Sequence, residues 1–474
     1  MLMKGMVIVL RITWLQFKHS FKVWLLTLLL FVVTGFLVGT CLNAAFAIAD
    51  YFPSLPKAHN PTDLFLYPLI FGLITVLIVS SGVVKLVINS LSQEYALWTI
   101  LGANPRQLSG LIGGQMALIA ALGSLVGFIL SVPVMVPVDQ WFVVTLLGSE
   151  WTPKIPQIPQ SFSLTACVLT VLFTVGVSGL AGYLHAHKLF VSSQDDLLTF
   201  KKSRSPFQRV SQALLIVVSA AGVVFCYWNS LSVTPQAQAY LDRHHFYEAG
   251  KTYIPNLMLI LLLSIILFAL IAKAILPWVI QLWTWLLPRK SSATVNDAFW
   301  STVFDKEYLT SLISPLTAGS FMLTGITCIA GEISNGGPNA AAAANTRESV
   351  IGFVGVPLSI ILANVLTITI LTSAQKRAGI RQLSRLGFTR RNLVVEKVQE
   401  ALIYATTFFI CAVLGILPFN LLTDHIVLMT HRTIALSGWS IFTWPLWLWL
   451  IMMIFIAVVG SWQAKVVSNR LVDN

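Results

Sequence analysis

Residues 93–108 read QEYALWTILGANPRQL, a polar stretch of helix-forming residues between two long apolar runs. Its core has the pattern L-G-x-x-x-R-x-L at residues 101–108, and the same pattern recurs at residues 386–393. We call residues 93–108 the first elbow and residues 378–393 the second elbow. Each elbow leads directly into another apolar run, so the chain reads as a duplicated membrane protein with one polar connection repeated in each half.

The composition is that of a polytopic membrane protein. Of 474 residues, 56% are hydrophobic and 10% are charged, and the mean hydropathy is +0.81. A soluble domain carries about 25% charged residues. The formal charge of +12 comes without a long basic tail or a basic-aromatic groove, so we expect no nucleic acid among the partners.

Apolar runs of about 20 residues are long enough to cross a bilayer as helices. The sequence predicts an all-α, ten-span fold. The expected spans are 23–46, 65–88, 109–136, 163–186, 209–230, 255–277, 309–330, 349–373, 397–420 and 441–463. The seventh is the least apolar, being rich in Ser, Thr and Gly, but small residues are tolerated where transmembrane helices pack together.

The distribution of Lys and Arg predicts that both termini are cytoplasmic. With the N-terminus inside, only six of the 30 basic residues fall on the outer side, and the others lie inside or at the inner boundary. The six outer residues are Lys57, Lys154, Arg243, Lys251, Arg347 and Arg432. This orientation places both elbows on the cytoplasmic side.

The repeat also predicts the domain organisation. The shift along the chain that carries Gly102 onto Gly387, which we call the repeat offset, also pairs spans one to four with spans seven to ten. We expect an interfacial N-terminal helix at 1–22, a first four-helix core at 23–190, a linker with spans five and six at 191–290, and a second core at 291–474. The second core would also begin with an interfacial helix.

The chemistry of the elbows suits docking. We expect each to form a short polar helix at the membrane surface, with Gly102 or Gly387 at a left-handed turn. Arg106, Arg390 and Arg391 can form directional, charge-assisted bonds to carboxylates of a cytoplasmic partner. The alternative is that these arginines only set topology. The matched spacing of the two copies favours docking.

The pattern Q-E-x-A…L-G-x-x-x-R-x-L resembles the signature of FtsX-like, or MacB-type (type VII), ABC transporter permeases, and the resemblance covers both four-span cores. The four-two-four arrangement is similar to BceB-type permeases, although the connections after spans one and seven are too short for those relatives' large extracellular domain. The second elbow departs from the signature because Gly379 stands where the first has Glu94. The residues expected to dock a cytoplasmic partner are Glu94, Leu101, Gly102, Arg106, Leu386, Gly387, Arg390 and Arg391.

The resemblance implies that the elbows are coupling helices seated on a cytoplasmic ABC ATPase, two copies per chain. It implies export of an amphiphilic substrate (a peptide, an antimicrobial peptide or a lipid-like molecule) across a bacterial cytoplasmic membrane. The chain has no G-x-x-x-x-G-K-[ST] phosphate loop, so we expect ATP and Mg to be bound by the partner and this chain not to be an enzyme itself. The alternative is an FtsX-like regulator that signals to an envelope partner without moving substrate.

Candidate substrate-path residues are few. Asn364 lies inside the eighth span, where it either lines a path or forms an interhelical hydrogen bond. Trp141 and Trp151 lie in an outer connection, where they either meet an amphipathic substrate or act as interfacial anchors. The adjacent His244 and His245 have no further ligands nearby in the sequence, so we expect no metal site.

Overall fold

The computed structural model describes most of the chain as long helices. The described residues are 21–51, 62–90, 104–147, 162–198, 206–286, 292–334, 340–434 and 439–472. Every regular element within these ranges is helical, which confirms the predicted all-α class.

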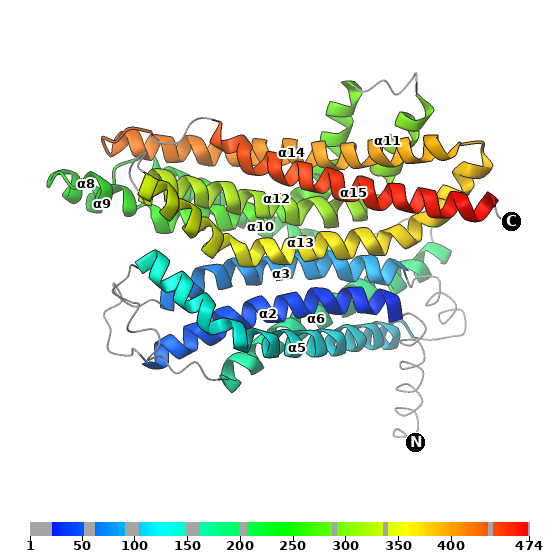
Figure 1. Ribbon diagram of the computed structural model, residues 1–474, viewed down its shortest axis with the longest axis horizontal. Coiled ribbons are helices and arrows are strands. Elements are labelled where there is room, and N and C mark those ends of the chain that lie inside the picture. Colours follow the sequence, from blue (N-terminus) through cyan, green and yellow to red (C-terminus); the bar gives the residue numbers. More distant parts are fainter. Residues whose placement is uncertain are drawn as a thin grey trace. The chain divides into compact units, whose positions relative to one another are not determined.

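The α-helices are α2 (Phe21–Tyr51), α3 (Thr62–Ser90), α5 (Pro105–Leu147), α6 (Leu164–Leu198), α7 (Pro206–Ser230), α8 (Pro235–Leu241), α9 (Phe246–Lys251), α10 (Ile254–Trp283), α11 (Ala293–Phe304), α12 (Lys306–Cys328), α13 (Ala340–Arg385), α14 (Arg390–Met429) and α15 (Ser440–Val472). Two short elements extend them, a 3₁₀ turn η4 (Thr284–Leu286) after α10 and a π-helical turn η5 (Ile329–Ser334) after α12. Figure 1 shows the long helices running alongside one another within each part of the chain.

Ten helical segments in the described residues are long and apolar enough to cross a membrane, and each overlaps one predicted span. The multi-pass membrane character is therefore confirmed. Several helices extend well beyond the length that the apolar runs predict. The longest is α13, with 46 residues, because the alanine run at its start consists of strong helix formers. The predicted outer connection 331–348 is therefore largely helical within the described residues.

The least apolar span is the most buried. The segment Tyr308–Ile333 of α12 and η5 has a hydropathy of only 1.5, yet 94% of its most apolar window is buried inside the protein. Some of its hydroxyls bond back to the helix: Thr317 Oγ1, for example, donates to the Ile313 carbonyl oxygen at 2.9 Å. By contrast, only 11% of the corresponding window in α7 is buried. The helix rich in Ser, Thr and Gly thus faces protein, and the strongly apolar one is left for lipid.

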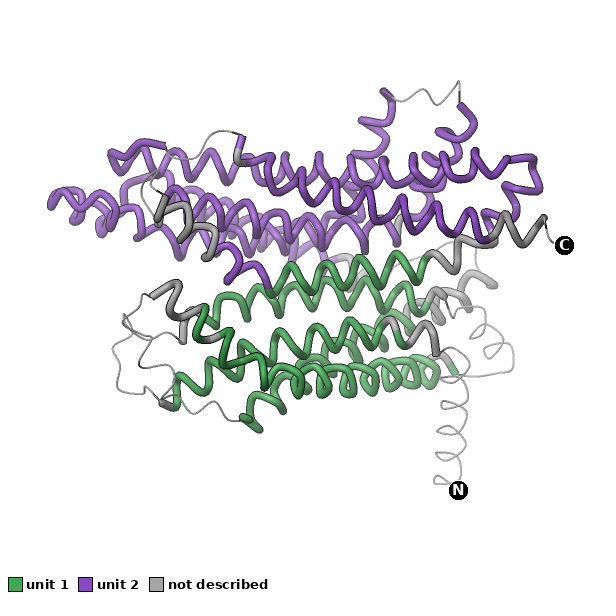
Figure 2. Tube along the Cα trace, viewed as in Figure 1, with its two compact units in different colours: residues 1–203, 356–375 green, residues 204–355, 376–474 purple. Residues whose placement is uncertain are grey.

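The chain divides into two compact units (Figure 2). Unit 1 contains residues 1–203 and 356–375, and unit 2 contains residues 204–355 and 376–474. The middle of α13 therefore belongs with unit 1, whereas its two ends belong with unit 2. The predicted boundaries at 190 and 290 stay predictions, and the predicted interfacial helix at 1–22 falls almost wholly outside the described residues. A separate helix, α11, does precede α12 as expected.

Unit 1 is built on a close crossing of α2 and α5. Each helix brings a G-x-x-x-G pair to the crossing, Gly35 and Gly39 on α2, Gly123 and Gly127 on α5. A Cβ atom added at Gly127 would overlap the backbone oxygen of Val32, and one added at Gly35 would overlap the backbone of residue 124. Small residues that let two backbones touch are the usual basis of helix association in membranes.

Unit 2 is centred on α12, which packs against α10, α14 and α15. Trp side chains join the helices by hydrogen bonds to buried hydroxyls. Trp283 Nε1 donates to Thr407 Oγ1 at 3.0 Å, and Trp444 Nε1 donates to Thr327 Oγ1 at 2.8 Å. Helix α7 lies outermost, with α10 as its main neighbour. Helix α14, which begins at the second elbow, also packs against α11 and α15.

Candidate functional site

The second elbow is a tight helix-to-helix turn. Helix α13 ends at Arg385, and Gly387 follows with φ of +94°, in the left-handed region. The backbone N–H of Phe388 donates to the Leu383 carbonyl oxygen, and that of Gly387 donates to the Ser384 carbonyl oxygen, each at 3.1 Å. This pair of bonds is a Schellman motif, and its left-handed position favours glycine. The prediction of a left-handed turn at Gly387 is confirmed.

Both elbows start the next helix in the same way. Thr389 caps α14, since its side chain accepts a hydrogen bond from the Asn392 backbone N–H at 3.3 Å. At the equivalent position of the first elbow, Asn104 Oδ1 accepts from the Arg106 backbone N–H at 3.0 Å. Ser, Thr, Asp and Asn are the preferred residues at this position. The repeat offset thus relates the caps as well as the sequence pattern.

The matched residues after each cap share their environments. Arg106 and Arg391 are exposed, and two positions later Leu108 and Leu393 are buried, at 3% and 1% exposure. Arg390 is also exposed. Among the other predicted docking residues, Leu386 is exposed at 78%. Glu94, Leu101 and Gly102 lie outside the described residues.

One expectation about the second elbow is wrong. The polar stretch before Gly387 is not a separate short helix at the membrane surface but the last turns of α13, continuous with the span. No proline interrupts the sequence SAQKRAG at residues 373–379, and most of its residues are good helix formers. The polar part of the second elbow is therefore the carboxyl-terminal end of a 46-residue helix.

The exposed arginines occupy an unfavourable place for helix stability. The amino-terminal end of a helix carries a partial positive charge, so cations in the first turn cost about 0.3–1 kcal/mol each. Arg106, Arg390 and Arg391 all lie in first turns, and neither α5 nor α14 has an acidic residue there. An interaction with an anionic group outside the helix would offset this cost.

A buried ion cluster lies next to the second elbow on α14. Lys397 Nζ is 3.0 Å from Glu396 Oε1 and 2.8 Å from Glu400 Oε2, and all three residues are at most 8% exposed. Gly460 of α15 leaves room for the aliphatic stem of Lys397, because a Cβ added there would stand 3.2 Å from the Lys397 Cβ. A buried ion pair is weak evidence for stability, so its retention in a membrane helix indicates a functional role.

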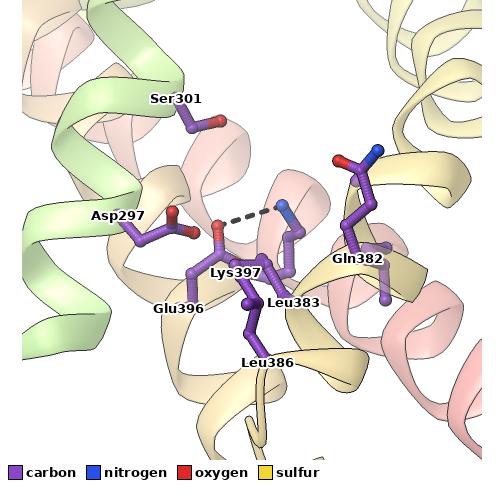
Figure 3. Close-up of a pocket in the computed structure, with 9 residues that line it drawn as sticks. Asp297, Ser301, Gln382, Leu383, Leu386, Glu396 and Lys397 are labelled. Atoms are coloured by element: carbon purple, nitrogen blue, oxygen red, sulfur yellow. Dashed lines mark hydrogen bonds and ion pairs between the residues drawn. The ribbon is translucent and has the colours of Figure 1, made fainter.

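A pocket of about 270 Å³ opens beside this cluster (Figure 3). Three helix segments of unit 2 line it: α11, the end of α13, and α14. The lining residues are Asp297, Ser301, Gly379, Ile380, Gln382, Leu383, Leu386, Glu396 and Lys397. Leu386 and Gly379 belong to the second elbow itself, so the pocket is part of the predicted docking region.

Two carboxyl groups meet at this pocket. Figure 3 shows the Asp297 side chain, from α11, facing that of Glu396. Burial raises the pKa of the Asp297 carboxyl, as does the nearby Glu400 charge, while Lys397 lowers it. Glu396 Oε1 accepts a hydrogen bond from the Lys397 ammonium, but Glu396 Oε2 is buried and has no hydrogen-bond partner within the described part of the chain.

The sequence pattern indicates the elbow but not the Asp297–Glu396–Lys397 group. The available signal is three charged residues, Glu396, Lys397 and Glu400, within or at the edge of an apolar run, where ionisable side chains are costly. Asp297 carries no such signal, because α12 and α13 lie between it and the cluster in the sequence. Asp297 reaches the cluster only because α11 packs on α14.

The predicted substrate-path residues stay predictions. Asn364 is fully buried in the part of α13 that belongs to unit 1. Trp141 lies near the end of α5 with 42% exposure, as an interfacial anchor would, and Trp151 falls outside the described residues. Within the described parts of the chain, no group of three or more His, Cys, Asp or Glu side chains is placed to hold a metal ion. All five cysteines are buried, and none of them forms a disulfide bond.

The far end of α14 is fastened by Arg432. Its guanidinium Nη2 donates to the Glu332 carbonyl oxygen at 2.6 Å and Nη1 to the Ile333 carbonyl oxygen at 3.3 Å, which ties η5 in place. The same guanidinium lies 5.0 Å from the centre of the Tyr247 ring on α9. Burial lowers the Arg432 pKa. These hydrogen bonds stabilise η5, the π-helical turn that follows α12.

No family model and no curated protein sequence matches the chain.

Proposed function

We propose that the chain is the membrane subunit of an ATP-driven transporter of the FtsX-like type, with two repeated four-helix cores. A separate cytoplasmic ATPase, in two copies, docks beneath the two elbows. ATP-driven closure of the ATPase pair moves the elbows together and with them α5 and α14. The substrate class, an amphiphilic peptide or lipid-like molecule moved outward, comes from the resemblance of the elbow pattern.

The observation that carries this proposal is the matched elbow. Both copies present an exposed arginine one position after the first helical residue and a buried leucine two positions later, behind equivalent polar caps. A topology signal needs only positive charge at the inner surface and no fixed geometry. A pair of docking sites for two identical subunits needs the same geometry twice.

The helix pattern supports the repeat independently of the elbow. The repeat offset carries Phe21, where α2 begins, onto Lys306, where α12 begins, and Pro105 of α5 onto Arg390 of α14. The packing also corresponds. In unit 1, α2, α5 and α6 contact one another pairwise, and so do α12, α14 and α15 in unit 2.

Reversing the charge at both elbows tests the proposal. In nanodiscs with the ATPase, the double variant Arg106→Glu/Arg391→Glu should lose the increase in ATP hydrolysis that the intact chain gives, by roughly ten-fold or more, because each site loses charge-assisted bonds and gains repulsion. Each single variant should lose part of it. The matched control is Arg243→Glu, an exposed arginine on the predicted outer side. Normal coupling in the double variant would contradict docking at the elbows.

A further inference from the structure

The pocket beside the second elbow has an excess of negative charge. Asp297 and Glu396 line it with two carboxyl groups, against one basic lining residue, Lys397. Lys397 is already paired with Glu396 and with Glu400, which lies next to the pocket but does not line it. Glu396 is fully buried, yet its Oε2 atom has no hydrogen-bond donor among the residues that the structure describes. Leaving a buried carboxylate oxygen without a donor is costly, so a further donor or cation at this point would lower the free energy.

The shape of the pocket admits such a group. Its volume of about 270 Å³ lies just below the ~300–1,000 Å³ of sites for drug-sized ligands, which suits a single long side chain. Gly379 keeps the pocket lining open, because a Cβ added there would meet no atom within 4 Å. At the equivalent position the sequence of the first elbow has Glu94, so the glycine is specific to the second elbow.

The first repeat has no counterpart of the charged cluster. The repeat offset places Leu111, Ile112 and Gln115 where the second repeat has Glu396, Lys397 and Glu400. One half of the molecule therefore has an acidic pocket, and the other half has neutral residues at the same positions. A partner that docks twice meets two chemically different sites.

The pocket is acidic within a basic surface. Exposed arginines flank its lining residues in the sequence, at 381, 385, 390 and 391. An acidic partner surface would pair with these arginines, and only a basic group fits the pocket between them. Opposite charges in this fixed arrangement would set the register of the partner as well as its affinity.

We propose that the pocket at the second elbow receives one basic side chain, an arginine or lysine, from the cytoplasmic ATPase, and that Glu396 Oε2 accepts its hydrogen bond while Asp297 faces its charge. The proposal rests on the proposed function for the identity of the partner, but the chemistry of the pocket does not depend on it. Docking at the two elbows is consequently asymmetric, with the basic side chain engaged at one elbow only.

A proton shared between Asp297 and Glu396 would also satisfy the unpaired oxygen. That arrangement needs no open space, whereas the observed pocket is lined by three helix segments and is left open by Gly379. The cation is therefore the better-supported occupant. A shared proton is one of the outcomes that the experiment separates.

The first experiment uses the chain alone in phosphatidylcholine nanodiscs with n-butylguanidinium as probe, followed by ligand-observed NMR. Butyltrimethylammonium is the matched cation, with equal charge but no N–H donor. We expect the guanidinium to bind more tightly. Glu396→Gln should weaken its binding roughly ten- to hundred-fold, the range for a hydrogen bond to a charged group.

A second variant keeps the test valid if Glu396→Gln fails to fold. Gly379→Leu fills the open position without removing a carboxylate and should also abolish guanidinium binding. Gly110→Leu is its control, because that glycine of α5 is likewise exposed with no atom near its added Cβ and does not line the pocket. Equal binding of the guanidinium to the intact chain and to both pocket variants would overturn the proposal. The proposal would also be overturned if neither cation bound tightly and the intact chain took up a proton that the Asp297→Asn variant did not take up.

The second experiment measures the affinity of the purified ATPase for the same nanodiscs. Weaker binding to Gly379→Leu, with unchanged binding to Gly110→Leu, supports the proposal in the complex. Unchanged ATPase affinity in Gly379→Leu, with reduced affinity in Arg106→Glu/Arg391→Glu, overturns the basic-side-chain proposal and leaves the transporter function standing. Guanidinium binding without any ATPase affinity supports the pocket chemistry and overturns the transporter function.

Discussion

At the scale of single residues, the two glycines of the second elbow, Gly379 and Gly387, have different structural roles. Gly387 has φ of +94° and closes α13 with a Schellman motif, so its lack of a side chain is a conformational requirement. Gly379 is an ordinary helical residue within α13, and its lack of a side chain leaves space beside the pocket. One glycine therefore serves the turn and the other serves the pocket.

This difference gives a matched pair of variants. Gly387→Ala should destabilise the protein by about 1 kcal/mol or more, because an L-residue is strained in the left-handed region. Gly379→Ala should leave stability unchanged or raise it by up to about 1 kcal/mol, because alanine favours the helix and its Cβ meets open space. Thermal unfolding of both variants in nanodiscs, followed by Trp fluorescence, measures the two effects. Equal shifts in the same direction would contradict the assignment.

The residue-level features differ in how far the sequence predicts them. The turn at Gly387 was predictable because Leu-Gly after helix formers is a local signal that needs no tertiary contact. The buried group of Asp297, Glu396 and Lys397 was not, because burial and pairing depend on how α11 and α14 pack. Spacing along α14 alone places Lys397 beside Glu400 but says nothing of Asp297.

At the scale of helices, the amino-acid composition of a span is related to how much of that span is buried in the protein. The α12 span is the least apolar and the most buried, while α7 is strongly apolar and mostly exposed. Hydropathy predicted all ten spans because each helix needs about 20 apolar residues to cross the bilayer. It did not predict that α13 continues into the second elbow as far as Arg385, because hydropathy detects the end of an apolar run and not the end of a helix.

The crossing of α2 and α5 gives a prediction at this scale. Gly127→Ala should destabilise unit 1 by about 1–3 kcal/mol, because the added methyl group overlaps the Val32 backbone oxygen and the two helices must move apart. Gly114→Ala, on the same helix but with no atom within 4 Å of its added Cβ, is the control and should not lower stability. Comparing their unfolding midpoints measures the cost of separating the helices. A midpoint for Gly127→Ala equal to that of the control would show that the crossing does not limit stability.

At the scale of the whole molecule, the docking proposal requires both elbows to face the cytoplasm. The imbalance of Lys and Arg predicts this orientation. Cysteine labelling can test it cleanly, because all five native cysteines are buried and should react slowly. A membrane-impermeant maleimide should label Glu248→Cys, on exposed α9, in intact cells, and should label Arg385→Cys, at the end of α13, only after permeabilisation. The reverse pattern would place the elbows outside and exclude a cytoplasmic partner there.

The most direct test of the central claim is the composition of the complex in its own membrane. Native mass spectrometry after gentle detergent extraction should find one copy of this chain with two copies of a nucleotide-hydrolysing subunit. The Arg106→Glu/Arg391→Glu variant should lose both copies, because each elbow seats one of them. A chain found without an ATPase, or with a kinase or an envelope protein in its place, would contradict the transporter account and favour a signalling role.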